Sequence, residues 1–86
     1  MKILYKNEMF LSRGEIILSK IAERLRLLRK ERQFERKEIA DHIGVTVRAS
    51  QYYEEGKREP NLDKVVAMAT FLKVSTDYLL GLKDTP

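Results

Sequence analysis

The sequence contains no cysteine, and only two prolines and four glycines among its 86 residues. Without cysteine, neither a disulfide framework nor a thiolate metal site can supplement the core, and an intracellular compartment is favoured. With so few helix breakers, and with 43% hydrophobic and 35% charged residues, the composition is that of a folded chain rather than a disordered tail. A chain of this length forms one domain, which excludes the large enzyme folds.

Long apolar runs are missing as well. Residues 1–5 are apolar except for Lys2, and they give way to charged and polar residues at 6–8, far short of the apolar length that a signal peptide requires. The longest later apolar stretch, residues 65–72, is much shorter than the roughly 20 residues of a membrane span. We therefore expect a soluble, cytoplasmic protein that does not bind membranes.

The charge of the chain is only mildly biased. Lysine and arginine number 17 against 13 acidic residues, which gives a net charge of +4 and a pI near 9.5. Many ordinary soluble domains carry such a surplus, so charge alone favours a nucleic-acid partner only weakly. The arrangement of the residues has to decide.

The N-terminal fifteen residues differ in pattern from the segment that follows. Residues 1–15 show neither a period of two nor one of 3.6, and we interpret them as an extension whose structure the sequence leaves open. Ser12 and Glu15 have the spacing of a capping box, which Gly14 in the first turn weakens. After them, apolar residues recur at steps of four, four and three and predict an amphipathic helix ending near residue 31 or 32; they are Ile17, Ile21, Leu25 and Leu28.

Four shorter helices are predicted after the first. Each has a flanking residue that favours a helix start or a helix end. In chain order they are 36–43 closed by Gly44, 47–54 capped by Thr46, a fourth capped by Asn61, and a fifth capped by Ser75 and closed by Gly81. The expected buried stripe of the fourth consists of Leu62, Val65, Val66, Ala69 and Leu72.

No segment alternates like a strand, and there is no internal repeat. The predicted fold class is therefore all-α, a compact bundle of five short helices. We expect an N-terminal extension over residues 1–15, the helical domain over 16–82 and a short tail over 83–86.

The second and third predicted helices are joined by only about three residues, 44–46. Each helix is too short to be stable separately, so the two must cross at a steep angle, which is the geometry of a helix-turn-helix. Ala40 is small enough to allow close approach of the two helices, and Gly44 makes the turn. Apolar contacts around them are expected from Ile39, Ile43, Val45 and Tyr53.

Four stretches of the chain, in order and with matching spacing, resemble the lambda-repressor-like, Cro/CI-type (Xre) helix-turn-helix family. They are LRLLRKE at 25–31, IADHIGVT at 39–46, YEEGKREP at 53–60 and VSTDYLLG at 74–81. The resemblance runs from about residue 17 to residue 82. It implies a sequence-specific DNA-binding transcriptional regulator, a repressor of phage or bacterial type that binds a palindromic operator in double-stranded DNA as a homodimer.

The third helix supplies the expected base-reading residues. Positions 50 and 53 turn inward, which leaves positions 47, 48, 51 and 52 on the outer face. In a major groove, an arginine bonds two guanine acceptors, a glutamine bonds adenine, and apolar groups contact the thymine methyl. The expected readers are Val47, Arg48, Gln51 and Tyr52, with Thr46, which matches a family position near the groove. The alternative interpretation is an ordinary solvated helix face.

Phosphate contacts are expected beside the reading helix. Arg36 stands where the family commonly has a glutamine that meets the DNA backbone, and Lys57 and Arg58 follow the reading helix as in the family. Each has an alternative interpretation as ordinary surface charge. The resemblance also implies a structural ion pair between Arg29 and Glu54.

Three residues depart from the family pattern. Ser50 stands where an isoleucine or valine usually faces the core, and its hydroxyl needs a partner. Glu35 replaces the usual serine or threonine cap of the second helix, and Glu55 replaces an arginine or asparagine that is often close to phosphate. A carboxylate near phosphate repels it, so these departures bear on DNA affinity more than on the fold.

Enzymatic chemistry is not expected. His42 is the only histidine, and no cysteine or paired carboxylates stand at ligand spacing beside it, so we predict no metal and no cofactor. The alternative function is an antitoxin-like or partner-binding interaction module of the same fold, and the chain also fits the DNA-binding part of a longer regulator. The expected dimer surface is the N-terminal extension or the C-terminal residues Tyr78, Leu79, Leu80 and Leu82.

Overall fold

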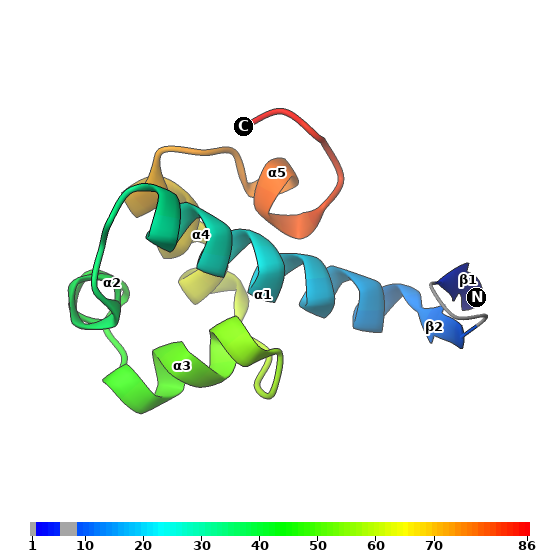
Figure 1. Cartoon of the computed structure of the whole chain (residues 1–86), viewed down its shortest axis with the longest axis horizontal. Helices are drawn as coiled ribbons and strands as arrows, with labels where there is room; N and C mark the ends of the chain where they lie inside the picture. The colour runs from blue at the N-terminus through cyan, green and yellow to red at the C-terminus, as the bar shows by residue number, and fades with distance from the viewer. Residues whose placement is uncertain (1, 6–8) are drawn as a thin grey trace.

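The computed structural model describes residues 2–5 and 9–86. In chain order, the elements are β1 (Lys2–Tyr5), β2 (Met9–Ser12), α1 (Arg13–Glu31), α2 (Arg36–Ile43), α3 (Val47–Glu55), α4 (Leu62–Leu72) and α5 (Thr76–Leu80). The predicted bundle of five helices is confirmed. The long helix α1 forms its centre, with α3 packed on one side and α5 on the other, while α4 packs against α2 and α5 (Figure 1).

Hydrogen bonds at the helix ends follow the predicted caps. The Oγ of Ser12 accepts the amide of Glu15 at 3.1 Å and the Glu15 carboxylate accepts the amide of Ser12 at 3.3 Å, so the capping box forms despite Gly14. Because this box starts α1 at residue 13, the helix begins before residue 16, where the predicted domain starts. Side chains also cap α3, α4 and α5; the capping residues are Thr46, Asn61 and Ser75.

All five helices contribute side chains to the core. Its buried side chains are Ile21, Leu25, Leu28, Ile39, Ile43, Tyr53, Val65, Met68, Ala69, Leu72 and Leu79. The predicted buried stripe of α4 is wrong at two positions, because Leu62 and Val66 are 76% and 47% exposed. Leu62 and Val66 lie on the flank of the buried stripe, and Leu62 is in the exposed first turn of α4. The buried Met68 completes the stripe's spacing of three and four residues instead.

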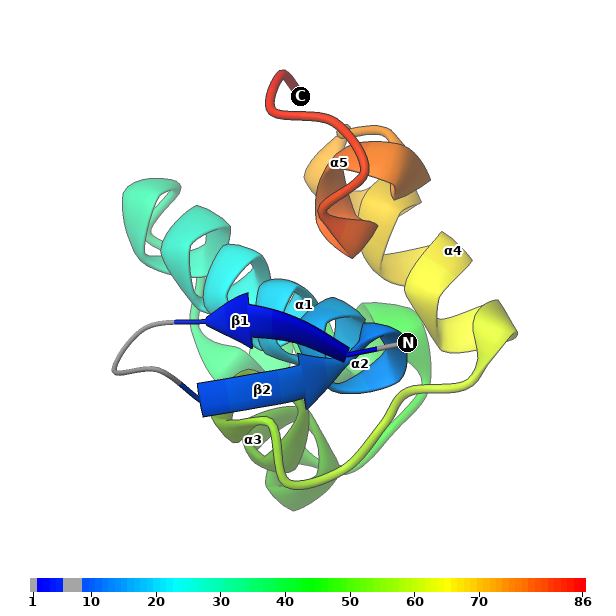
Figure 2. The same cartoon turned by 90° about the vertical axis from the view of Figure 1, so that its right-hand side faces the viewer.

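The N-terminal segment, whose structure the sequence leaves open, contains a β-hairpin. Strands β1 and β2 pair antiparallel; the partners are Lys2 with Ser12, Ile3 with Leu11, Leu4 with Phe10 and Tyr5 with Met9. Apolar residues occupy consecutive positions in both strands, which hides the period of two that marks a half-buried strand. The hairpin projects from the start of α1, beyond the bundle (Figures 1 and 2).

A buried arginine ties the C-terminal segment to α1. Arg24 donates from Nη1 to the carbonyl oxygens of Tyr78 and Lys83, and its Nη2 lies 3.4 Å from a carboxylate oxygen of Asp84. Its guanidinium carbon also stands 4.2 Å from the centroid of the Tyr78 ring. These contacts fix the end of α5 against α1. Within residues 2–5 and 9–86, no helix combines the length and the apolar character that crossing a membrane demands.

Candidate nucleic-acid interface

The turn between α2 and α3 fixes the angle at which the two helices cross. Gly44 closes α2 in the left-handed region, with φ of 75°, a conformation that costs glycine little. Its neighbour Val45 donates its amide to the carbonyl of Ala40 at 3.0 Å. In Figure 1, α2 is seen nearly end-on while α3 runs across the view, so the two helices cross steeply. The predicted helix-turn-helix geometry is therefore present.

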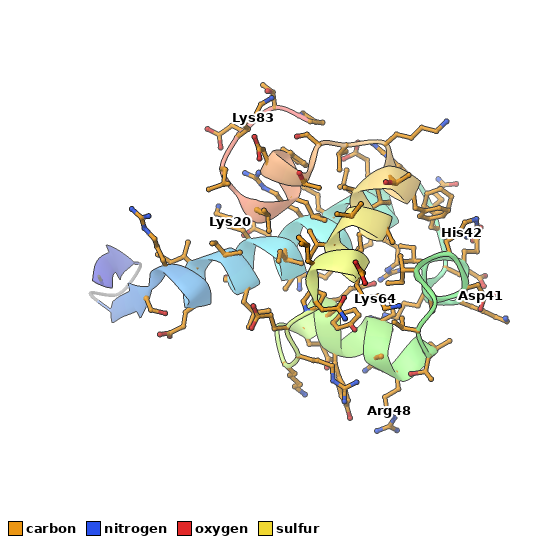
Figure 3. The ribbon with its side chains drawn as sticks, turned by 180° about the vertical axis from the view of Figure 1, so that it is seen from behind. Lys20, Asp41, His42, Arg48, Lys64 and Lys83 are labelled. Atoms are coloured by element: carbon orange, nitrogen blue, oxygen red, sulfur yellow. The ribbon has the colours of Figure 1, made fainter. Side chains whose placement is uncertain are left out.

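A lysine from α4 braces this turn. The Nζ of Lys64 donates to the carbonyl of Ile43 at 3.0 Å and lies 3.5 Å from that of Gly44 (Figure 3). These are the last carbonyls of α2, which have no partner within the helix and attract a positive charge. Sequence reasoning missed this role, because nothing in the local pattern around Lys64 relates it to a turn twenty residues earlier.

Helix α3 has one buried face and one open face, as its sequence predicts. Ala49, Ser50 and Tyr53 are buried, whereas Val47 and Arg48 are exposed. Arg48 extends from α3 away from the bundle (Figure 3). The remaining predicted readers share this open side; Thr46 is exposed, and Gln51 and Tyr52 are half-buried.

Tyr52 lies between two arginines on the open face. Its hydroxyl accepts a hydrogen bond from Nη1 of Arg48 at 3.1 Å, and the guanidinium carbon of Arg58 stands 5.3 Å from the centroid of its ring. Contacts of this kind hold flexible arginines near an aromatic face. The structure thus brings together one predicted base reader and one predicted phosphate contact around a third side chain.

Glu55, in the last turn of α3, binds two other predicted contact residues. Its carboxylate accepts from Nε2 of Gln51 at 3.2 Å and lies 3.4 Å from Nζ of Lys57. The hydrogen bond from Gln51, and then the charges of Lys57 and Arg36, hold the pKa of the Glu55 carboxyl below its ordinary value. The carboxylate is therefore ionised at neutral pH.

The buried carboxylate of Glu54 is surrounded by arginines. Arg29 donates from Nε to Glu54 Oε2 at 2.7 Å, so the predicted pair forms, and Arg26 donates to the Glu54 carbonyl at 3.1 Å. Arg36 contributes its Nε, 3.6 Å from Oε1 of Glu54, while its side chain stays 39% exposed. Sequence reasoning missed the contact between Arg36 and Glu54, because it considered Arg36 only as a phosphate contact or as ordinary surface charge.

The structure places two further residues that the sequence analysis names. Leu79, named as part of a C-terminal dimer surface, is wholly buried and belongs to the core, because it points from α5 toward α1 and α4. His42 is exposed on α2, its ring packs on that of Phe71 with centroids 4.1 Å apart, and its Nδ1 lies 2.9 Å from the carbonyl oxygen of Glu38. In the part of the chain that the structure describes, no three potential metal ligands gather.

Comparison with known proteins decides the family. Residues 22–85 match the model of a family described as a helix-turn-helix domain. The chain belongs to this helix-turn-helix family. The match covers every helix of the bundle except the first turns of α1 and therefore includes the α2–α3 crossing and the open face of α3.

The relatives of this helix-turn-helix domain are named as regulators. It is 41% identical over 64 residues to the uncharacterized HTH-type transcriptional regulator YobD of Bacillus subtilis, covering 74% of this chain and 57% of YobD. It is 36% identical over 62 residues to the cryptic phage CTXphi transcriptional repressor RstR of Vibrio cholerae, covering 72% of this chain and 55% of RstR. The chain thus spans about half the length of these curated relatives.

The helix-turn-helix fold also matches solved structures. The restriction-modification controller protein C.AhdI from Aeromonas hydrophila superposes with a TM-score of 0.67 at 27% identity, over 72% of this chain and 94% of that protein. A transcriptional regulator from Listeria innocua gives a TM-score of 0.68 at 34% identity, over 71% of this chain and 57% of that protein.

Proposed function

We propose that this chain is a sequence-specific DNA-binding transcriptional regulator, a repressor, that inserts α3 into the major groove of double-stranded DNA. The observation that carries the proposal is the open face of α3, which presents an arginine, a glutamine and a valine on a helix held steeply against α2. An α-helix fits the major groove, and these side chains suit its base edges. The names of YobD and RstR support the assignment to regulation and to repression.

The base-reading roles follow from chemistry and position. Arg48 is the reader of guanine, and Gln51 the reader of adenine, since each can form two hydrogen bonds with its base. The methyl groups of Val47 pack on a thymine methyl. Thr46 caps α3 by accepting the amide of Ala49 at 3.1 Å, which leaves its hydroxyl proton available to the DNA.

The phosphate contacts are placed on the two sides of the reading helix. Arg36 is the first residue of α2, where the positive end of the helix dipole favours an anion. Lys57 and Arg58 stand in the loop after α3, both exposed. Such contacts set the register of the protein on the duplex and carry no sequence information.

A second copy of the chain completes the proposed site. One helix reads only a few base pairs, and family geometry pairs two reading helices on half-sites about 34 Å apart. The palindromic operator mirrors the two-fold axis of a homodimer. Exposed apolar side chains on α4 and after α5, Leu62, Val66 and Leu82, support association between copies.

Selection from a pool of random duplexes tests the proposal. The chain is expected to enrich a palindromic motif, and Arg48→Ala is expected to lose the preference at one base pair of each half-site, at a cost of about 1–3 kcal/mol per contact. Arg13→Ala is the matched control, because Arg13 is an exposed arginine at the hairpin end of α1.

The rival function, an antitoxin-like or partner-binding module, draws support from the carboxylate of Glu55 on the side of α3 proposed to face DNA. If the selection enriches no motif although the chain is folded and dimeric, the regulator proposal fails and the rival stands.

A further inference from the structure

Three of the predicted DNA-contacting side chains already contact carboxylates at the end of α3 in the structure. Gln51 and Lys57 both bind the carboxylate of Glu55, and Arg36 stands 3.6 Å from that of Glu54. We propose that Glu55 is an intramolecular competitor of DNA phosphate, which lowers the affinity of the protein for every duplex by about the same factor. This inference rests on the proposed function and adds a positioning residue to it.

The two adjacent carboxylates have different surroundings. Glu54 is 1% exposed and is bound by Arg29, so it belongs to the frame of the bundle. The side chain of Glu55 is 34% exposed, and both groups that it binds are proposed DNA contacts. Glu55 can therefore release its partners without opening the core.

Glu55 stands where the helix dipole does not favour its charge. It is the last residue of α3, where the helix dipole disfavours a negative charge, and the last turn of α3 contains no basic residue. Its cationic partner, Lys57, lies beyond the helix end, with its Nζ 3.4 Å from Oε1 of Glu55. The carboxylate thus acts on the groups of the proposed interface rather than on the fold.

Binding to DNA has to replace the contacts that Glu55 makes with Lys57 and Gln51 by contacts with the duplex. Lys57 must leave the carboxylate to reach a phosphate, and the vacated carboxylate then stands near the same phosphates and repels them. Both effects concern the DNA backbone, which is the same for all sequences. Glu55 thereby sets the sequence-independent part of the affinity, and the preference for bases stays with Arg48 and Gln51.

The variant Glu55→Gln tests this inference, because glutamine keeps an oxygen that accepts from Gln51 and removes the charge. The Kd for the selected operator and for an unrelated duplex are measured over a series of salt concentrations. We expect both to fall by a similar factor, about eightfold at 0.1 M salt, with the slope of log K against log salt steeper by about one unit. Glu59→Gln, which removes an exposed carboxylate from the following loop, is the control and is expected to change both far less.

A second pair of variants tests whether the effect passes through Lys57. In a background that carries Lys57→Gln, the change Glu55→Gln is expected to tighten binding by a distinctly smaller factor. Thermal unfolding checks that Glu55→Gln is folded, with a melting temperature within a few degrees of that of the original chain.

Two results overturn the inference. Unchanged Kd values in a folded Glu55→Gln variant would show that the carboxylate does not compete with phosphate. A change confined to one base pair of the operator would show that Glu55 reads a base, since a carboxylate can accept from the cytosine amine. Failure of the original chain to bind any duplex overturns the proposed function itself, and the competitor role with it.

Discussion

At the scale of single residues, the buried carboxylate of Glu54 connects the fold to the proposed interface. It lies at the end of the reading helix and is bound by Arg29 of α1, with Arg36 of α2 close by. A buried ion pair adds little to the free energy of unfolding, but a single charged partner left unpaired in the interior lowers it strongly. The pair therefore fixes where α3 ends relative to α1 and α2.

Removal of either partner is expected to destabilise the bundle. Arg29→Ala or Glu54→Ala strands a buried charge at a cost of about 3–5 kcal/mol. The melting temperature, followed by circular dichroism, is expected to fall by more than 10 °C, since about 1 kcal/mol corresponds to roughly 4–8 °C in a chain of this size. Glu59→Ala, at an exposed position, serves as the control. Unchanged melting temperatures in both variants would remove the structural role of the pair.

Ser50, which departs from the family pattern, is buried in the structure. Its side chain is fully buried, and its hydroxyl has no hydrogen-bond partner. Ser50→Ala removes this unsatisfied group and is expected to raise the free energy of unfolding by about 1 kcal/mol. Denaturant titration measures it, with the exposed Ser19→Ala as control. A clear loss of stability would mean that the hydroxyl is satisfied after all.

The lowered pKa of Glu55 gives a prediction about pH. Because the pKa is below the ordinary value of 4.5 in the folded chain, the group binds fewer protons folded than unfolded, and any stabilising effect is lost as the pH falls through the folded pKa. At pH 6–8 the carboxylate is fully charged. The ratio of the DNA affinities of Glu55→Gln and the original chain is therefore expected to stay constant over pH 6–8. A ratio that drifts toward one in this range would contradict the assignment.

At the scale of elements, the N-terminal hairpin stands apart from the bundle. Strand β2 contacts α1, and isolated two-stranded hairpins are marginally stable. A chain that starts at Ser12 retains the cap of α1. We expect it to melt within a few degrees of the full chain and to bind the same duplexes with unchanged sequence preference. A large fall in the melting temperature would assign the hairpin a part in the core.

The elements differ in how far the sequence predicts them. The helix ends at Gly44, Gly56 and Gly81 and the caps at Thr46 and Asn61 depend on neighbouring residues, so local patterns reveal them. The hairpin depends on pairing between segments, which a scan for alternation does not detect.

Contacts between distant residues escape local patterns altogether. Arg24 reaches Tyr78 and Lys83, and Lys64 reaches the end of α2, across separations that no spacing rule covers. The open face of α3 was predictable because helix periodicity alone determines it. The contacts that Gln51 and Lys57 make with Glu55 were not predictable, because they depend on the conformations of long side chains.

At the scale of the whole molecule, a net charge of +4 provides only a weak general attraction to DNA, so individual contacts determine the affinity. Lys57→Gln is expected to weaken binding to all duplexes and to reduce the slope of log K against log salt by about one unit. Fluorescence anisotropy at several salt concentrations measures this slope. A loss restricted to one base position would instead make Lys57 a base reader.

The brace from Lys64 to the end of α2 has a consequence for motion. Because one ammonium group joins α4 to the carbonyls of Ile43 and Gly44, an opening of α4 also releases the turn that orients α3. Slow amide hydrogen exchange in α2 and α4 should consequently reflect one cooperative unit. A ligand that binds the exposed face of α4 and stabilises it would then also limit the motion of α3, without contacting α3.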